Sequence, residues 1–133
     1  MAKFVVDCGV VLRLAAEETE VAREHRLLAP TLLRSQTLSG LHEAVHAGEL
    51  EPEVARERLA RVTKLPIRLL GDAVLRRRAW EIADQLGWAD TYDAEYIALT
   101  QLQGDAFVTL DKQLAREVKD VVETATFDAL HRA

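Results

Sequence analysis

Short apolar runs alternate along this chain with longer segments of helical periodicity, and this alternation restricts the possible folds more than any other feature. The two clearest runs, Lys3 to Val6 and Ala106 to Leu110, are rich in β-branched and aromatic residues. Such runs are typical of strands that are buried on both faces. The alternation therefore predicts an α/β domain with a mostly parallel sheet and helices on both faces.

The other expected strands are less regular in sequence. They are Arg26 to Ala29, which precedes a proline, Pro66 to Leu70, and a short one near Val121 and Val122. Helices are expected where apolar residues recur at helical spacing or where proline and glycine mark the ends. These helices cover Gly9 to Ala16, Thr31 to Ala47, Pro52 to Lys64, Asp72 to Leu86, Asp90 to Gln101 and Lys112 to Glu117.

Within this pattern, the helices at Thr31 to Ala47 and Pro52 to Lys64 are expected to form a hairpin, because only a short connection separates them. The helix at Asp72 to Leu86 has an apolar side that we expect to be buried. Its members are Val74, Leu75, Ala79, Ile82, Ala83 and Leu86.

The length and composition fit one folded domain that covers residues 1–133. The chain has 133 residues, of which 49% are hydrophobic and 29% charged, and no apolar stretch is long enough to cross a bilayer. The N-terminus lacks the pattern of a signal peptide, and the single cysteine, Cys8, cannot form an internal disulfide. We therefore expect a cytoplasmic protein. A catalytic role for Cys8 is not favoured, because no histidine lies near it in the sequence.

The net charge of −5 argues against the broad basic surface of a duplex DNA-binding protein. A nucleic-acid substrate would need positive charge from a bound metal or from local basic clusters. Such clusters contain Arg56, Arg58, Arg61, Lys64, Arg68 and the run Arg76 to Arg78. The run of arginines can equally be a solvated helix face.

Three aspartates stand where strands end or helices begin. Asp7 follows the first strand, Asp111 follows the strand at Phe107, and Asp93 lies in the first turn of a helix. Taken singly, each is well explained as a helix cap or as an anion near the positive end of a helix dipole. In a parallel sheet, however, Asp7 and Asp111 share an edge if their strands are neighbours. Carboxylates gathered there repel one another, and a bound Mg²⁺ or Mn²⁺ would remove that repulsion. Phosphodiester hydrolysis is the chemistry that such a site supports.

Four blocks of sequence resemble the PIN-domain ribonucleases, and among them the VapC-type toxins of toxin-antitoxin pairs. They are Phe4 to Asp7, Ala29 to Gln36, Thr91 to Leu99 and Phe107 to Leu114, and they occur in the family's order. The resemblance implies a PIN-like fold with about five strands, and metal-binding roles for Asp7, Asp93 and Asp111. It also implies that the Thr109 hydroxyl supports Asp111, that the chain forms a homodimer, and that a DNA-binding antitoxin covers the site.

The sequence departs from the family pattern at Gln36, where a glutamate is usual. A glutamine oxygen can orient a water or complete a metal shell, but it brings no negative charge. Glu43 lies seven residues further along the helix, about 10 Å away, which is too far for a simple replacement. Gly9 stands where the family often has a small hydroxyl residue. Asp90 is interpreted as a helix cap, with an outer metal-ligand role as the other possibility.

Other candidate sites are weaker. His42 and His46 have the spacing of a metal-binding pair, but no third ligand is evident. The large aromatic residues do not form a regular stacking series, and we expect them mainly in the core or at a dimer interface. They are Trp80, Trp88, Tyr92 and Tyr96. Trp88 and Tyr92 flank Asp93 and could also stack on a base.

The sequence thus predicts a Mg²⁺-dependent endoribonuclease, the toxin of a toxin-antitoxin pair, with Asp7, Asp93, Asp111, Gln36 and Thr109 in its active site. Two alternatives come from other functional classes. The first is a weak or inactive PIN-like domain that binds RNA or protein, which Gln36 supports. The second is a receiver-type phosphoacceptor, which the sequence does not support because no adjacent acid pair follows the first strand.

Overall fold

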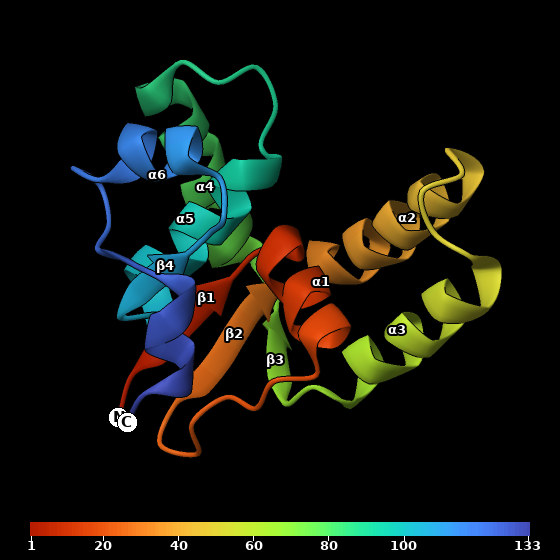
Figure 1. The fold of residues 1–133 in the computed structure, drawn as a ribbon. Helices are drawn as coiled ribbons and strands as arrows, with labels where there is room; N and C mark the ends of the chain where they lie inside the picture. Colours follow the sequence, from red (N-terminus) through yellow and green to blue (C-terminus); the bar gives the residue numbers. More distant parts are fainter.

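The computed structural model describes residues 1–133, and its centre is a five-stranded sheet in which all strands are parallel. The strand order is β3-β2-β1-β4-β5, so β1 lies in the middle (Figure 1). The strands are β1 (Lys3–Val6), β2 (Arg26–Pro30), β3 (Ile67–Leu70), β4 (Ala106–Val108) and β5 (Thr124–Ala125). The predicted fold class, an α/β domain with a mostly parallel sheet, is confirmed.

Six α-helices and one short 3₁₀ helix surround the sheet. They are α1 (Cys8–Glu17), α2 (Leu32–His46), α3 (Pro52–Lys64), α4 (Ala73–Leu86), α5 (Tyr92–Gln103), α6 (Lys112–Val118) and the 3₁₀ helix η1 (Phe127–His131). Helix α5 packs on β1, β2 and β4, with α4 against it, whereas α1 packs against α2 and α3. As predicted, α2 and α3 form a hairpin, and they extend side by side away from the sheet (Figure 1). None of these helices has the length and apolar composition of a membrane span.

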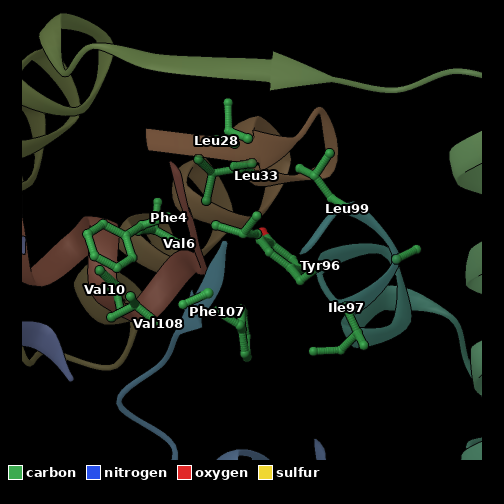
Figure 2. Close-up of a cluster of buried hydrophobic side chains, with 14 of the residues drawn as sticks. Phe4, Val6, Val10, Leu28, Leu33, Tyr96, Ile97, Leu99, Phe107 and Val108 are labelled. Carbon is green, nitrogen blue, oxygen red and sulfur yellow. The ribbon is translucent and has the colours of Figure 1, made fainter. Parts of the chain in front are cut away.

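The core forms around β1. Successive strand residues point to opposite faces of a sheet, and Phe4, Val5 and Val6 are all buried, so both faces of β1 are covered. Figure 2 shows the surrounding apolar cluster, in which the ring of Tyr96 reaches from α5 toward Val6 and the α2 residue Leu33. Burial of this cluster supplies the main driving force for folding, because apolar area removed from water contributes about 25 cal/mol per Å².

Two strand predictions need correction. The last strand is at Thr124–Ala125, where it pairs with Phe107 and Val108, and not at Val121 and Val122. Those two valines lie in the turn after α6, and both of their backbone N–H groups donate to the Val118 carbonyl. The strand predicted to reach Leu110 ends at Val108, because its neighbour β1 ends at Val6 and provides no further hydrogen bonds.

One burial prediction was wrong. Val74 is 54% exposed, because about 100° of helical rotation separates it from Leu75, which faces the core. Trp80 and Tyr92 are 68% and 55% exposed, so neither lies in the core of this chain, and their expected place at a dimer interface stays a prediction. Of the four large aromatic residues, Tyr96 is fully buried and Trp88 is half-buried against the core.

Candidate active site

The strand order places a topological switch point between β1 and β4. The chain leaves β1 through α1 to reach β2 on one side, whereas β4 lies on the other side. In open parallel sheets, ligands bind beyond the carboxyl ends of strands at such a point. Val6 is paired with Val108, so the residues that follow them, Asp7 and Thr109, emerge next to each other.

Asp7 makes hydrogen bonds with both carboxylate oxygens. Its Oδ1 accepts the backbone N–H of Val10 at 3.1 Å, which caps α1, and its Oδ2 accepts the Thr109 hydroxyl at 2.5 Å. The cap and the site are therefore not competing explanations for this residue. The capping bond fixes the carboxylate at the switch point.

Thr109 connects the two strand ends. Besides donating to Asp7, its hydroxyl oxygen accepts the backbone N–H of Asp111 at 3.1 Å. The family resemblance implied that this hydroxyl supports the Asp111 carboxylate. In the structure it instead bonds the Asp7 carboxylate and accepts the Asp111 backbone N–H, because the pairing of Val6 with Val108 brings Thr109 beside Asp7.

Asp111 caps α6. Its Oδ1 accepts the backbone N–H groups of Gln113 and Leu114, at 3.0 and 3.1 Å. Both bonds involve the same oxygen, which leaves Oδ2 available for another ligand. Asp111 itself is exposed.

Asp93 lies in the first turn of α5, where the partial positive charge of the helix terminus attracts anions. The N-cap residue is Thr91, without a side-chain bond, and the Asp90 carboxylate accepts the N–H of Tyr92 at 3.2 Å. Asp90 therefore does hold the start of α5, as its interpretation as a cap predicted, and the helix begins two residues later than expected.

The three aspartates lie near enough to one another for their charges to interact. Burial raises the pKa of Asp7, and repulsion from Asp111 adds to this, although the bonds from Thr109 and Val10 oppose it. Burial also raises the pKa of Asp93, followed by repulsion from Asp7, Asp90, Asp111 and Glu117. Elements far apart in the sequence thus bring like charges close enough to destabilise one another.

No cationic side chain relieves this repulsion. The ion pairs of the chain all involve other acids: Glu17, Glu18, Glu57 and Glu81. No three His, Cys, Asp or Glu side chains lie close enough to hold a metal ion by themselves. The donor set nevertheless fits a hard cation such as Mg²⁺, which commonly keeps several waters and takes only one or two protein carboxylates. Asp7, Asp93 and Asp111 are the residues that could hold it.

Gln36 is hydrogen-bonded to Tyr96, a residue near the aspartates that the sequence suggested only as a core or interface aromatic. The Tyr96 hydroxyl donates to Gln36 Oε1 at 2.5 Å, and burial together with nearby acids, including Asp7 and Asp93, raises the pKa of Tyr96. Tyr96 is three residues after Asp93, so both lie on one side of α5. This spacing was the available sequence signal for a polar role of Tyr96.

The remaining candidates are peripheral. Burial raises the pKa of Cys8 to about 11, and repulsion from Asp7 and Glu43 adds to this, so its thiol stays protonated and weakly nucleophilic at neutral pH.

The other candidates lie on the surface of the helices. Glu43 is exposed on α2. His42 and His46 are also exposed and belong to no metal-binding group. Arg76 and Arg77 are exposed on α4, and Arg78 bonds Gln101 and pairs with Glu81.

A sequence model of the PIN domain matches residues 4–120. The chain belongs to the PIN domain family. PIN domains are generally nucleases, and the location of the acids at the switch point of this PIN domain is consistent with that activity. No curated protein matches the sequence.

Two solved structures share the fold of this PIN domain. PAE2754 from Pyrobaculum aerophilum superimposes with a TM-score of 0.77 and 22% sequence identity, over 97% of this chain and 92% of that one. A chain of VapBC-1 from nontypeable Haemophilus influenzae superimposes with a TM-score of 0.63 and 12% identity, over 95% of this chain and 98% of that one. These likenesses extend over almost the whole domain and support the VapC-type resemblance at the level of the fold.

Proposed function

We propose that this PIN domain is an endoribonuclease that depends on Mg²⁺ or Mn²⁺ and hydrolyses RNA phosphodiester bonds. The proposal rests on one observation: three aspartates lie at the switch point, and none of them forms an ion pair with a cationic side chain. A bound divalent ion would stabilise charge on the phosphate and lower the pKa of an attacking water.

The protein residues have separate tasks in this proposal. Asp7, Asp93 and Asp111 hold the ion. Thr109 keeps the Asp7 carboxylate in place and orders the turn that carries Asp111. Gln36 contributes its amide to the same site through the bond from Tyr96. Solvent supplies the nucleophile, since no side chain here has the properties of an activated nucleophile.

The change Asp7→Asn tests the proposal. Asparagine can still cap α1 through its carbonyl oxygen, so the fold should survive, but one of the negative charges that attract the metal is lost. We expect Mg²⁺-dependent cleavage of RNA to fall by at least a hundredfold, measured by gel electrophoresis of labelled single-stranded RNA. Asp84→Asn, an exposed change on α4, is the matched control. Cleavage by Asp7→Asn at the rate of the control would reject the proposal.

The biological role that we propose is that of a cytoplasmic toxin whose partner is an antitoxin protein. It rests on the VapC-type resemblance in the sequence and on the fold shared with a chain of VapBC-1. In addition, we propose a homodimer, which light scattering of the purified protein tests directly. Growth arrest on expression, lost in Asp7→Asn, would support the toxin role, and normal growth with active protein would contradict it.

One observation favours a second function, a weak or inactive PIN-like domain that binds RNA or protein. Gln36 occupies the position where the family usually has an acid. Changing Gln36→Glu separates the two, because a large gain in cleavage indicates a weakened nuclease. Absence of cleavage in both forms would favour the binding function.

A further inference from the structure

The hydrogen bond between Tyr96 and Gln36 determines which end of the Gln36 amide is left free. A glutamine side chain has one acceptor oxygen and one donor NH₂ group. The Tyr96 hydroxyl donates to Oε1 at 2.5 Å, so the oxygen is engaged on the Tyr96 side. The donor group Nε2 makes no hydrogen bond within the protein and is not buried. The group of Gln36 that is left without a partner is therefore a donor, Nε2, whereas its oxygen is held on the Tyr96 side.

The surroundings of Tyr96 hold its hydroxyl in the position that this orientation requires. Its ring is buried, 1% exposed, and packs near Phe107 with ring centroids 6.3 Å apart, which fixes the position of the hydroxyl. Burial and the surrounding acids raise the pKa of Tyr96, so the phenol remains protonated at every physiological pH. A phenol that keeps its proton can donate to the amide oxygen, as it does here.

The substitution of an acid by glutamine has a specific chemical consequence in this arrangement. A glutamate at position 36 could accept the same bond from Tyr96 and would present its second oxygen, an anionic acceptor suited to a cation. Glutamine accepts that bond equally well but presents an NH₂ group, which cannot ligate a cation. An NH₂ group can donate to an anionic oxygen, and the phosphate of an RNA substrate brings such oxygens to a metal site.

We propose that Gln36 binds the RNA substrate and not the metal: its Nε2 donates to a non-bridging oxygen of the phosphodiester, and Tyr96 is the positioning residue that orients it. This inference rests on the proposed nuclease function and assigns a substrate contact within that site. One donor thereby takes the place of one metal-binding acid. The aspartates alone then determine metal affinity.

Two binding measurements on the full chain test this inference without relying on cleavage. Mn²⁺ affinity is measured by electron paramagnetic resonance of the free ion. RNA affinity is measured by fluorescence anisotropy of a random-sequence single-stranded 12-mer with unmodified phosphodiester linkages, in Ca²⁺. The variants are Gln36→Leu and Tyr96→Phe, and Gln85→Leu on the exposed surface of α4 is the matched control.

For Gln36→Leu we expect Mn²⁺ affinity within about twofold of the wild type and RNA affinity about tenfold weaker, the effect of one lost bond to a charged group. Tyr96→Phe should weaken RNA binding several-fold and leave Mn²⁺ affinity unchanged. The double variant should bind RNA no more weakly than Gln36→Leu, because Tyr96 acts through Gln36. A purely structural role of Tyr96 would instead give additive losses. Gln36→Glu should tighten Mn²⁺ binding, because it restores an anionic ligand.

The opposite pattern overturns the inference. If Gln36→Leu weakens Mn²⁺ binding tenfold and leaves RNA affinity unchanged at saturating metal, Gln36 is a metal ligand. Unchanged RNA affinity in Gln36→Leu, or no RNA affinity in the wild type, also excludes the donor role. Failure of the metal site itself is recognised separately, because Asp93→Asn would then bind Mn²⁺ as well as the wild type. Should Gln36→Leu fail to fold, Gln36→Ala replaces it, both alone and combined with Tyr96→Phe. The same changes in Mn²⁺ and RNA affinity then decide between the two roles of Gln36.

Discussion

At the scale of single residues, the site depends on a few side chains that each perform two tasks. Asp7 caps a helix and contributes charge to the site, and Thr109 bonds the Asp7 carboxylate while it holds the backbone of Asp111. The structural and functional explanations of these residues coincide, because the carboxyl ends of strands are also the starts of helices. The resulting cost is repulsion among carboxylates, which is measurable without any substrate.

Removing the Thr109 hydroxyl should loosen the Asp7 carboxylate. Thr109→Val keeps the size of the side chain but deletes both of its hydrogen bonds, and we expect about 1–2 kcal/mol of lost stability in urea denaturation. Cleavage of RNA should fall about tenfold. Thr109→Ser, which keeps the hydroxyl, serves as the control and should stay close to the wild type in both measurements. Equal losses in the two variants would argue against a role for the hydroxyl.

The repulsion at Asp93 predicts a dependence of stability on pH in metal-free protein. The folded-state pKa of Asp93 is raised, so ionisation is more costly in the folded state than in the unfolded chain. The raised pKa means that protonated Asp93 favours the folded state. This contribution to stability is complete below the pKa of Asp93 in the unfolded chain, about 3.9, and is lost as pH rises through the folded-state pKa. The helix dipole favours the anion, but the upward direction of the pKa shows that burial and repulsion outweigh it.

Asp93→Asn should accordingly stabilise the metal-free protein at pH 7, by about 0.5 kcal/mol after solvent screening of this exposed group is allowed for. The advantage should disappear as pH falls toward 4. Thermal melts of both proteins in EDTA between these pH values provide the measurement. An Asn variant that is less stable than the wild type at pH 7 would contradict the upward direction of the Asp93 pKa.

At the scale of elements, the junction between α5 and β1 fixes where Asp93 lies relative to Asp7. Gly104 ends α5, and the next residue, Asp105, donates its N–H to the Lys3 carbonyl at 2.7 Å. A Cβ atom at Gly104 would come within 2.9 Å of a Val5 methyl group and 3.3 Å of the Thr100 Cα. Glycine is therefore required here because the helix end and the central strand approach each other closely.

Gly104→Ala should lower stability by about 1–3 kcal/mol through overpacking of this junction. Gly9→Ala provides the contrast, because its Cβ would make only ordinary contacts, 3.8 Å or longer, within α1. That change should be neutral or stabilising by up to about 1 kcal/mol, since alanine favours a helix. Urea denaturation gives the free energy of unfolding of both variants. A Gly104→Ala protein as stable as the wild type would show that the junction can accommodate a Cβ atom.

At the scale of the whole molecule, the proposed metal site would link metal binding to folding, since it is assembled from three separate elements and does not exist in the unfolded chain. A ligand that binds only the folded state stabilises it by about 2.7 kcal/mol at a hundred times its Kd. Mn²⁺ should therefore raise the melting temperature, and EDTA should reverse the shift. Asp93→Asn should show little or none of it. An equal shift in both proteins would mean that the ion binds elsewhere.

The sequence by itself determined the class of fold and most of the elements. Apolar runs such as Phe4 to Val6 admit few alternatives to a buried strand, and proline and glycine mark the ends of α3 and α2 closely. It also placed Asp7 directly after a strand and Asp111 between a strand and a helix, although β4 ends at Val108, three residues before Asp111. These are local properties, and local sequence patterns carry them.

The tertiary structure alone decided which partners meet. The position of β5 depends on pairing with β4, so the apolar pair Val121 and Val122 predicted it wrongly. The neighbourhood of β1 and β4 brings Thr109 to Asp7 across a separation of 102 residues, and the packing of α5 brings Tyr96 to Gln36 across 60. No sequence pattern encodes such contacts, because they arise from how the elements pack and not from the residues beside them in the chain. That packing gives Gln36 its defined orientation, which the sequence could describe only as a missing charge.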